Sequence, residues 1–200
     1  MKNLILFSAV FVLFLIFRTT SNAQENQSLK GKYIIVLDIQ DIATKEAMVA
    51  EDAKNLIDVI NKVIEMSDAD KVIYIEAVAA MLDISLTGLS VQFMPGLYLD
   101  DRLKIVGENK FAKNKPSAFT SEQLIRFIKM RKARDFVVVG LMAEHCLLET
   151  LLEGVKLGYN MYMIPDAIAG ESNESKAAAL EKAMKNGVKT MELKNLMINN

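Results

Sequence analysis

One stretch of the chain, residues 136–169, restricts the fold more than any other part of the sequence. It begins with Phe136–Gly140, a continuous apolar run with three valines, which is typical of a strand buried on both faces. Leucines at helical spacing then fill His145–Leu157, and Gly158 follows as a helix stop signal. A second apolar run, Met161–Ile164, completes the pattern. The order strand, turn, helix, strand predicts a βαβ unit.

The rest of the chain continues this alternation. Apolar β-branched runs predict further strands, and a 3.6-residue apolar period predicts further helices. The expected strands are Tyr33–Leu37, Val72–Ile75, Leu103–Val106 and Val188–Leu193, and the expected helices cover residues 44–66, 121–134 and 175–185. Residues 76–98 show no clear period. We therefore expect an α/β fold, a three-layer sandwich whose mostly parallel central sheet has helices on both faces.

The first 23 residues have the composition of a secretory signal peptide. Lys2 is followed by the apolar run Leu4–Phe17, and Ser21-Asn22-Ala23 forms a small-x-small cleavage site. The apolar run is shorter than the roughly 20 residues that cross a bilayer. We expect cleavage after about Ala23, with an uncleaved anchor as the alternative. A flexible lead-in at 24–32, one domain at 33–195 and a periplasmic or secreted location would follow.

The net charge and the cysteine content limit which binding partners and disulfides this chain can have. The whole chain has a net charge of −1, and residues 1–23 carry two basic and no acidic residues, so the mature chain would have −3. Weak acidity argues against nucleic acid and against anionic membrane surfaces as partners. A homo-oligomer is also compatible with the sequence. The single cysteine, Cys146, allows no intramolecular disulfide.

Two reactive side chains follow predicted strands. Cys146 lies where the first strand of the βαβ unit has ended and the helix begins, and Asp38 follows Tyr33–Leu37. Right-handed crossovers bring the carboxyl ends of parallel strands to one edge of a sheet, where ligands bind. A helix N-terminus favours a thiolate, and a carboxylate could take up its proton. The cation that would hold this charge could be Lys110, Lys113 or Lys115.

Each of these residues also has an ordinary structural explanation. A lone cysteine is most often a small buried apolar residue. Asp38 could be a solvated loop carboxylate, and the run of lysines could be a solvated face.

Three blocks of sequence carry a resemblance to a known family. In chain order they are Ile34–Gln40 (IIVLDIQ), Lys113–Phe119 (KNKPSAF) and Val139–Cys146 (VGLMAEHC), the last continuing through Thr150, Gly158-Tyr159 and Asp166-Ala167. With these blocks the chain resembles the isochorismatase-like cysteine hydrolase superfamily, which includes nicotinamidases and N-carbamoyl amidohydrolases. The resemblance covers nearly all of residues 33–193.

The resemblance implies a catalytic triad. It assigns Cys146 as nucleophile, Asp38 as proton acceptor and Lys113 as the cationic partner, because Lys113 stands four residues before Ser117. It also implies a cis non-proline peptide at Met142–Ala143.

The same resemblance implies the surroundings of the reacting groups. The backbone N–H groups of Ala143 and Cys146 would form an oxyanion hole. Gln40, Phe119 and His145 are candidates for the substrate pocket.

The chain departs from nicotinamidases where their metal binds. The Asp-x-His element and the further histidine of those enzymes are missing from residues 76–80, and His145 is the only histidine in the chain. We therefore expect no metal and no cofactor. Asp41-Ile42-Ala43 also lacks the aromatic residue that often lines the pocket, which disfavours nicotinamide itself as substrate.

The expected function is an exported cysteine hydrolase that cleaves the C–N bond of a small amide or carbamoyl compound through a thioester on Cys146. One alternative is vinyl ether or ester hydrolysis on the same scaffold. Another is a secreted binding protein that keeps the fold without turnover.

Overall fold

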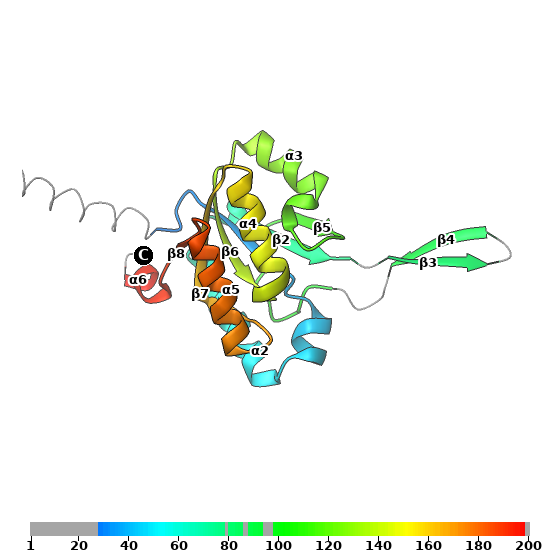
Figure 1. Cartoon of the computed structure of the whole chain (residues 1–200), viewed down its shortest axis with the longest axis horizontal. Coiled ribbons are helices and arrows are strands. Elements are labelled where there is room, and N and C mark those ends of the chain that lie inside the picture. Colours follow the sequence, from blue (N-terminus) through cyan, green and yellow to red (C-terminus); the bar gives the residue numbers. More distant parts are fainter. Residues whose placement is uncertain (1–27, 79, 86–87, 94–97, 199–200) are drawn as a thin grey trace, which may run out of the picture.

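The centre of the molecule is a six-stranded, all-parallel sheet in the order β5-β2-β1-β6-β7-β8 (Figure 1). The computed structural model describes residues 28–78, 80–85, 88–93 and 98–198. The strands of this sheet are β1 (Tyr33–Leu37), β2 (Val72–Ala77), β5 (Lys110–Lys113), β6 (Asp135–Gly140), β7 (Asn160–Ile168) and β8 (Lys189–Thr190). The expected parallel α/β architecture is confirmed.

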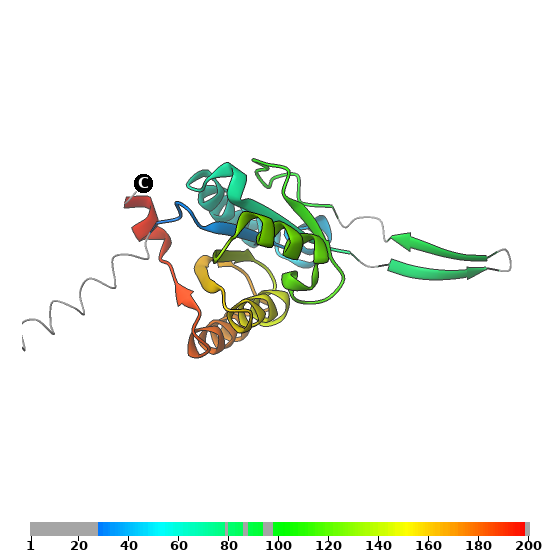
Figure 2. The same ribbon diagram turned by 90° about the horizontal axis from the view of Figure 1, so that it is seen from above.

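Helices cover both faces of the sheet. In the view from above, α2 lies on one side and α4 and α5 lie on the other (Figure 2). The helices are α2 (Ala50–Glu65), α3 (Glu122–Arg131), α4 (Leu148–Lys156), α5 (Asn173–Lys185) and α6 (Leu193–Ile198), and the short helical turns are η1 (Ile42–Ala47), η2 (Ala69–Lys71), η3 (Ala118–Thr120) and η4 (Ala143–Leu147). Among these described helices, none is both long and apolar enough to span a membrane.

The apolar strand runs follow from this layering. Every residue of β1 is buried, and successive residues of β6 belong to opposite cores. Val138 packs with α3, α4 and α5, whereas Val137 and Val139 pack with α2. A strand covered by helices on both faces has no polar face, so it reads as a continuous apolar run.

Several expected elements have different limits. The helix expected at 44–66 is two helices, because Met48 and Val49 take extended backbone conformations between η1 and α2. The strand expected at 103–106 is wrong: that segment is irregular, and the edge strand β5 lies at Lys110–Lys113 instead. Only Lys189–Thr190 of the expected last strand is a strand.

Strand β7 is longer than its apolar run. It continues through Pro165 to Ile168, because the ladder with β6 shifts register between Val138 and Gly140 and leaves the proline outside the regular pairing. A proline has no N–H to donate, so it is tolerated in a strand only at such an interruption.

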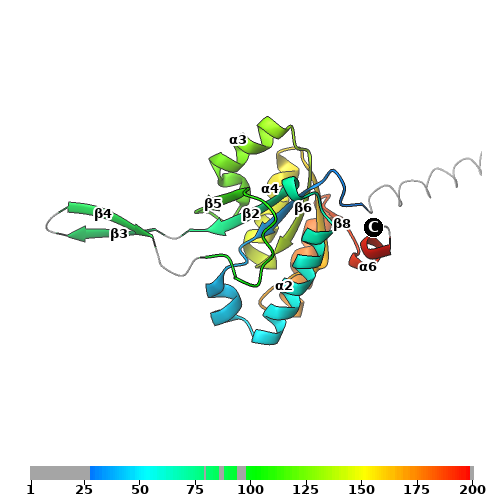
Figure 3. The ribbon, with the colours of Figure 1, turned by 180° about the vertical axis from the view of Figure 1, so that it is seen from behind.

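Residues 80–93, which showed no clear period, contain a two-stranded antiparallel hairpin formed by β3 (Ala80–Ser85) and β4 (Gly88–Phe93). We call this hairpin the arm. It stands away from the body in the front, top and back views (Figures 1, 2 and 3). The turn expected at Pro95-Gly96 and the signal segment 1–23 lie outside the described residues.

Candidate functional site

Asp38 is the first residue after β1, at the carboxyl edge of the sheet. Its backbone N–H donates to the Ile75 carbonyl at 3.0 Å, which extends the ladder with β2 by one step. Its φ of 56° is left-handed, a region in which aspartate is several-fold enriched among non-glycine residues. This turn of the backbone leaves Asp38 only 8% exposed.

Cys146 reaches the same edge from the neighbouring strand, β6. The strand ends at Gly140, whose φ is 122° and where a Cβ atom would lie 2.1 Å from the Leu37 carbonyl oxygen. Only glycine fits this crossing of β6 over β1. The cis peptide then joins Leu141 to Met142, one residue earlier than the expected Met142–Ala143 bond. Cys146 follows within η4, half-buried.

Lys113 completes the site from β5. It is the last residue of that strand, pairs in register with Ala77 of β2, and is 3% exposed. Its Nζ lies 2.9 Å from Asp38 Oδ2 and 3.2 Å from Cys146 Sγ. Lys110 and Lys115 are exposed. Of the three candidate lysines, the geometry therefore selects Lys113.

The three groups perturb one another electrostatically. Burial raises the pKa of the Asp38 carboxyl, and the charge and hydrogen bond of Lys113 oppose that rise. Burial also raises the pKa of the Cys146 thiol, the negative charge of Asp38 adds to the rise, and Lys113 opposes it. Burial and the charge of Asp38 therefore act against the thiolate that a helix start favours, and the charge of Lys113 acts for it.

The raised pKa of the Asp38 carboxyl suits this group for accepting a proton. A carboxylate whose pKa lies above its ordinary value is a better acceptor for a proton from a thiol. Lys113 contacts both partners, so it can stabilise the negative charge whether it resides on the carboxylate or on sulfur. The arrangement can therefore generate a thiolate when it is needed and take the proton next to it.

The expected oxyanion hole is corrected at one residue. The backbone N–H of Ala143 donates to the Ala169 carbonyl at 2.8 Å, so it is already satisfied by the loop after β7. The N–H of Met142, one residue earlier, makes no hydrogen bond within the described part of the chain. It lies in the same turn as Cys146, and it replaces Ala143 as the candidate donor.

The three expected pocket residues have other surroundings. Gln40 is buried, donates to the Ala77 carbonyl at 3.1 Å and accepts from its N–H at 2.8 Å, and so fastens the chain after β1 to the end of β2. Phe119 is 5% exposed and packs against Phe136 and Tyr159 in the core. His145 is exposed on the surface, its Nε2 lying 3.4 Å from Glu171 Oε1.

Thr150 supports the site in a way that sequence patterns did not reveal. Its hydroxyl donates to the Cys146 carbonyl at 2.7 Å and accepts from the Ala118 N–H at 3.0 Å. The residue is fully buried. One side chain therefore joins the nucleophile turn to the segment that follows Lys113. A threonine on the buried side of an apolar helix was the available signal, since a buried hydroxyl requires partners.

The end of β2 does not fit the zinc-type donor set. Glu76 and Ala77, its last two residues, and Val78 after them offer one carboxylate and no histidine. A separate cluster of Asp41, Asp100 and Asp101 is already neutralised, Asp100 by Arg102 and the other two by Lys45. Beside the Cys146 turn, Glu144, His145 and Glu171 do bring one imidazole and two carboxylates within 4.8 Å of one another, and of these three residues His145 and Glu171 are exposed.

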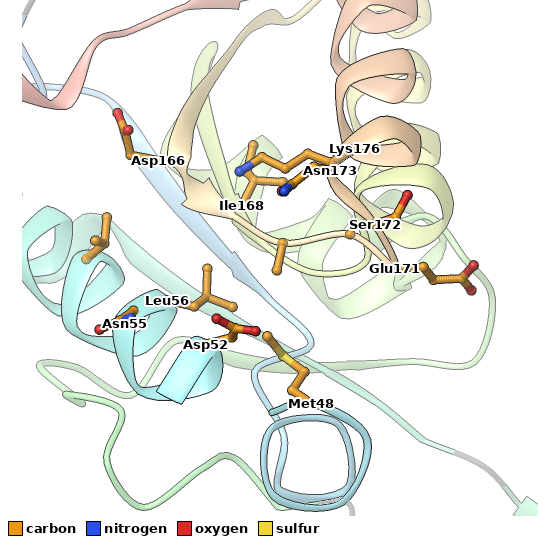
Figure 4. Close-up of a pocket in the computed structure, with 13 residues that line it drawn as sticks. Met48, Asp52, Asn55, Leu56, Asp166, Ile168, Glu171, Ser172, Asn173 and Lys176 are labelled. Carbon is orange, nitrogen blue, oxygen red and sulfur yellow. The ribbon is translucent and has the colours of Figure 1, made fainter. Parts of the chain in front are cut away.

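Two clefts adjoin the site region without containing the three reactive residues. One, of about 470 Å³, lies between α2 and the start of α5, where Asp52 and Asn55 face Asn173 and Lys176 (Figure 4). The other, of about 660 Å³, lies beside η1 and the Leu141–Met142 turn. The second is mainly apolar and is called the η1 cleft below.

Known proteins resemble this chain in sequence and in fold. The model of the isochorismatase domain family matches residues 32–195. Among curated proteins, a probable inactive nicotinamidase of Arabidopsis thaliana is 33% identical over 101 residues, 49% of this chain and 52% of the relative. The chain thus matches about half the length of that protein.

Solved structures share the fold. The pyrazinamidase of Pyrococcus horikoshii, in complex with zinc, superposes with a TM-score of 0.66 at 20% identity, covering 80% of this chain and 98% of the other. An isochorismatase-like hydrolase from Alkaliphilus metalliredigens gives a TM-score of 0.67 at 16% identity, with 86% and 98% covered.

Proposed function

The chain belongs to the isochorismatase family of hydrolases, and from that premise we propose that it is a cysteine hydrolase that cleaves the C–N bond of a small amide or carbamoyl compound. The observation that carries the proposal is the contact of Lys113 with both Asp38 and Cys146, at 2.9 and 3.2 Å. A structural cysteine needs neither a buried cation nor a buried carboxylate at its sulfur.

The proposed first step is acylation. The Cys146 thiol transfers its proton to the Asp38 carboxylate as sulfur attacks the substrate carbonyl carbon, which gives a tetrahedral intermediate with a negative oxygen. The N–H groups of Cys146 and Met142 are the proposed donors to this oxygen. Asp38 then returns the proton to the leaving nitrogen, the C–N bond breaks, and ammonia or an amine departs from a thioester.

The second step is hydrolysis of the thioester. Asp38, again ionised, accepts a proton from water as the water oxygen attacks the thioester carbonyl. Collapse of this intermediate breaks the C–S bond, releases the carboxylic or carbamic acid, and returns the proton to sulfur. Lys113 balances the negative charge in both steps, and no step requires a metal.

A non-catalytic binding protein is the second candidate. Two observations favour it: the related plant protein is described as a probable inactive nicotinamidase, and the pKa of the Cys146 thiol is raised by burial. The vinyl ether reaction of isochorismatases is less favoured, because the resemblance implies that it needs no cysteine. Ammonia release distinguishes C–N bond hydrolysis from the other two functions.

The deciding experiment screens small amides and ureido acids for ammonia release with wild type and Cys146→Ala. We expect turnover of at least one compound by wild type and a loss of about 10³-fold or more in the variant. A Cys146→Ala protein that releases ammonia as fast as wild type would refute the proposal. Wild type that releases no ammonia but binds members of the panel would favour the binding protein, and acid release without ammonia would favour ester or vinyl ether hydrolysis.

Export is proposed separately, from Lys2, the apolar run Leu4–Phe17 and the site at Ala23. N-terminal sequencing of protein recovered from outside the cytoplasm should begin at about Gln24. An intact Met1 on protein that stays in the cytoplasm would contradict export.

A further inference from the structure

The cleft between α2 and the start of α5, which we call the α2–α5 cleft, has a volume of about 470 Å³. This lies within the roughly 300 to 1,000 Å³ that is usual for pockets that bind small molecules. Part of its lining is apolar: Leu56 of α2 and Ile168 of β7 are both buried there, next to Val59. The size and this lining suit a small ligand that has an apolar part.

Polar side chains stand on the two opposite walls of the α2–α5 cleft. Asp52 comes from the α2 wall, and Asn173 and Lys176 come from the start of α5 (Figure 4). None of these three side chains has a hydrogen-bond or ion-pair partner in the part of the chain that the structure describes. Their polar groups are therefore available to a ligand that enters between the walls.

Lys176 differs from ordinary surface lysines because it is half-buried. Burial lowers the pKa of its ammonium group, and the charge of Asp166 opposes that fall without forming an ion pair. A partly desolvated cation without a partner is costly, and a bound carboxylate would relieve that cost through a charge-assisted hydrogen bond. Lys176 also lies in the first turn of α5, where the helix dipole favours a carboxylate.

The charged groups that face the space between the walls have opposite signs. Lys176 supplies the cation and Asp52 the anion, whereas the side chains of Asp166 and Glu171 point away from that space (Figure 4). A ligand with only a negative charge would meet Asp52, and a ligand with only a positive charge would meet Lys176. A ligand that carries both charges can pair each one with its opposite. The two walls therefore select a zwitterion.

The neighbouring η1 cleft lacks this combination of charges. Asp52 and Glu171 line it as well, but no lysine or arginine does among the described residues. A zwitterion bound in the η1 cleft would leave its carboxylate without a cation. The observations thus place the ligand in the α2–α5 cleft.

The α2–α5 cleft is separate from the candidate site, since none of the three reactive residues lines it. One loop lies between the two. The Ala169 carbonyl accepts from the Ala143 N–H at 2.8 Å, and the Glu171 N–H donates to Glu144 Oε1 at 2.7 Å. Ala169 and Glu171 also line the cleft. A ligand in the cleft would therefore contact the loop that is bonded to the nucleophile turn.

We propose that the α2–α5 cleft binds a small amino acid as a zwitterion, with its carboxylate on Lys176 and Asn173 and its ammonium group on Asp52. The apolar part of the amino acid packs on Leu56 and Ile168. The cleft is thus a second ligand site of this chain. The proposal stands independently of the reaction at the candidate site.

Isothermal titration calorimetry of the purified protein tests the choice of ligand. The probes are leucine and δ-aminovalerate, which represent an α- and an ω-amino acid, and at least one of them should bind with a dissociation constant below about 1 mM. Analogues that lack one charge are isocaproate and isopentylamine for leucine, and valerate and butylamine for δ-aminovalerate. Both analogues of the ligand that binds should bind at least tenfold more weakly.

Variants of the two walls test the place of binding. Lys176→Met and Asp52→Asn should each raise the dissociation constant at least tenfold. Their matched controls are Lys182→Met on α5 and Glu51→Gln in the first turn of α2, both exposed and outside the lining of the cleft, and these should bind as wild type does. Thermal melting checks the fold, and Lys176→Met should melt no lower than wild type because it removes a half-buried charge that has no partner.

Three results would overturn the proposal. The first is that neither amino acid binds at concentrations up to about 10 mM. The second is an analogue with one charge that binds as tightly as the amino acid, which would assign the cleft to an anion or to a cation alone. The third is binding that survives both Lys176→Met and Asp52→Asn, which would place the ligand elsewhere on the protein.

Discussion

Lys113 and Asp38 form a buried ion pair across a strand that lies between them. Lys113 ends β5 and Asp38 follows β1, and β2 separates these two strands in the sheet. The pair closes because both residues lie beyond Ile75, the last buried residue of β2, at the carboxyl edge: Asp38 follows the partner of Ile75, and Lys113 is the partner of Ala77. Cys146, from β6 on the far side of β1, completes a site that spans four neighbouring strands.

Lys113→Met should remove the cation and leave Asp38 buried without its partner. We expect activity to fall by about 10²- to 10³-fold, as when a charge-stabilising donor is removed from an active site. We also expect a stability loss of roughly 3 kcal/mol, because an unpaired buried charge remains. The matched control is Lys110→Met, an exposed position on the same strand. Urea unfolding and ammonia release measure both effects, and equal behaviour of the two variants would contradict this role for Lys113.

The reactivity of Cys146 should depend on pH in a way that identifies its neighbours. The thiolate is the form that reacts with iodoacetamide, and burial and then the Asp38 charge raise the pKa of the thiol. The midpoint of the rate against pH should therefore lie above about 8.5, the ordinary value for cysteine.

Two substitutions should move this midpoint in opposite directions. Asp38→Asn removes a charge that raises the thiol pKa, so the midpoint should fall. Lys113→Met removes a charge that lowers it, so the midpoint should rise. A midpoint that rises in Asp38→Asn would show that the carboxylate does not act on the sulfur.

Gly140→Ala should destabilise the fold strongly. A Cβ atom would lie 2.1 Å from the Leu37 carbonyl oxygen, and the φ of 122° is unfavourable for any L side chain. We expect a loss of about 3 kcal/mol or more in the free energy of unfolding. The control, Gly158→Ala, has a φ of 82° and open space around the same atom, so it should lose about 1 kcal/mol. Similar losses in the two variants would contradict the close crossing of β6 over β1.

Thr150→Val should loosen the nucleophile turn while keeping the shape of the side chain. The change deletes the bond to the Cys146 carbonyl and leaves the buried Ala118 N–H without an acceptor, which should cost roughly 1 to 3 kcal/mol. Thr150→Ser keeps the hydroxyl and should recover most of the lost activity. If Thr150→Ser were as impaired as Thr150→Val, the missing methyl group rather than the hydroxyl would be responsible.

Asp100→Asn should reduce stability at neutral pH but not in acid. Hydrogen bonds from Arg102, and then from Thr44, hold the pKa of the buried Asp100 carboxyl far below its ordinary value. Its folded pKa lies below its unfolded pKa, so the stabilisation is present above about pH 4 and is lost as the pH falls.

The expected loss for Asp100→Asn is about 2 kcal/mol at pH 7, shrinking toward pH 3. Asp101→Asn, whose exposed carboxylate pairs with Lys45, should change stability by less than about 1 kcal/mol at either pH. A loss for Asp100→Asn that is constant with pH would contradict the assignment.

Local sequence was sufficient for the elements that are buried on both faces. Tyr33–Leu37 and Phe136–Gly140 are apolar because helices cover them on two sides, so they can be recognised without any partner. The edge strand Lys110–Lys113 was missed for the opposite reason. This strand is only partly buried, and two of its four residues are lysines. Only its pairing with β2 makes it a strand.

The sequence by itself determined that Asp38 and Cys146 meet, because both follow parallel strands and such strands end at one edge. The family resemblance assigned Lys113, and the tertiary structure brings its Nζ against Asp38 and Cys146 while Lys110 and Lys115 are exposed. Only the tertiary structure decided that the Ala143 N–H is taken by Ala169. The physical reason is the same in both cases. The residues of a strand determine its apolar pattern. The direction of a side chain or an N–H group at the end of that strand depends on the distant backbone that packs against it.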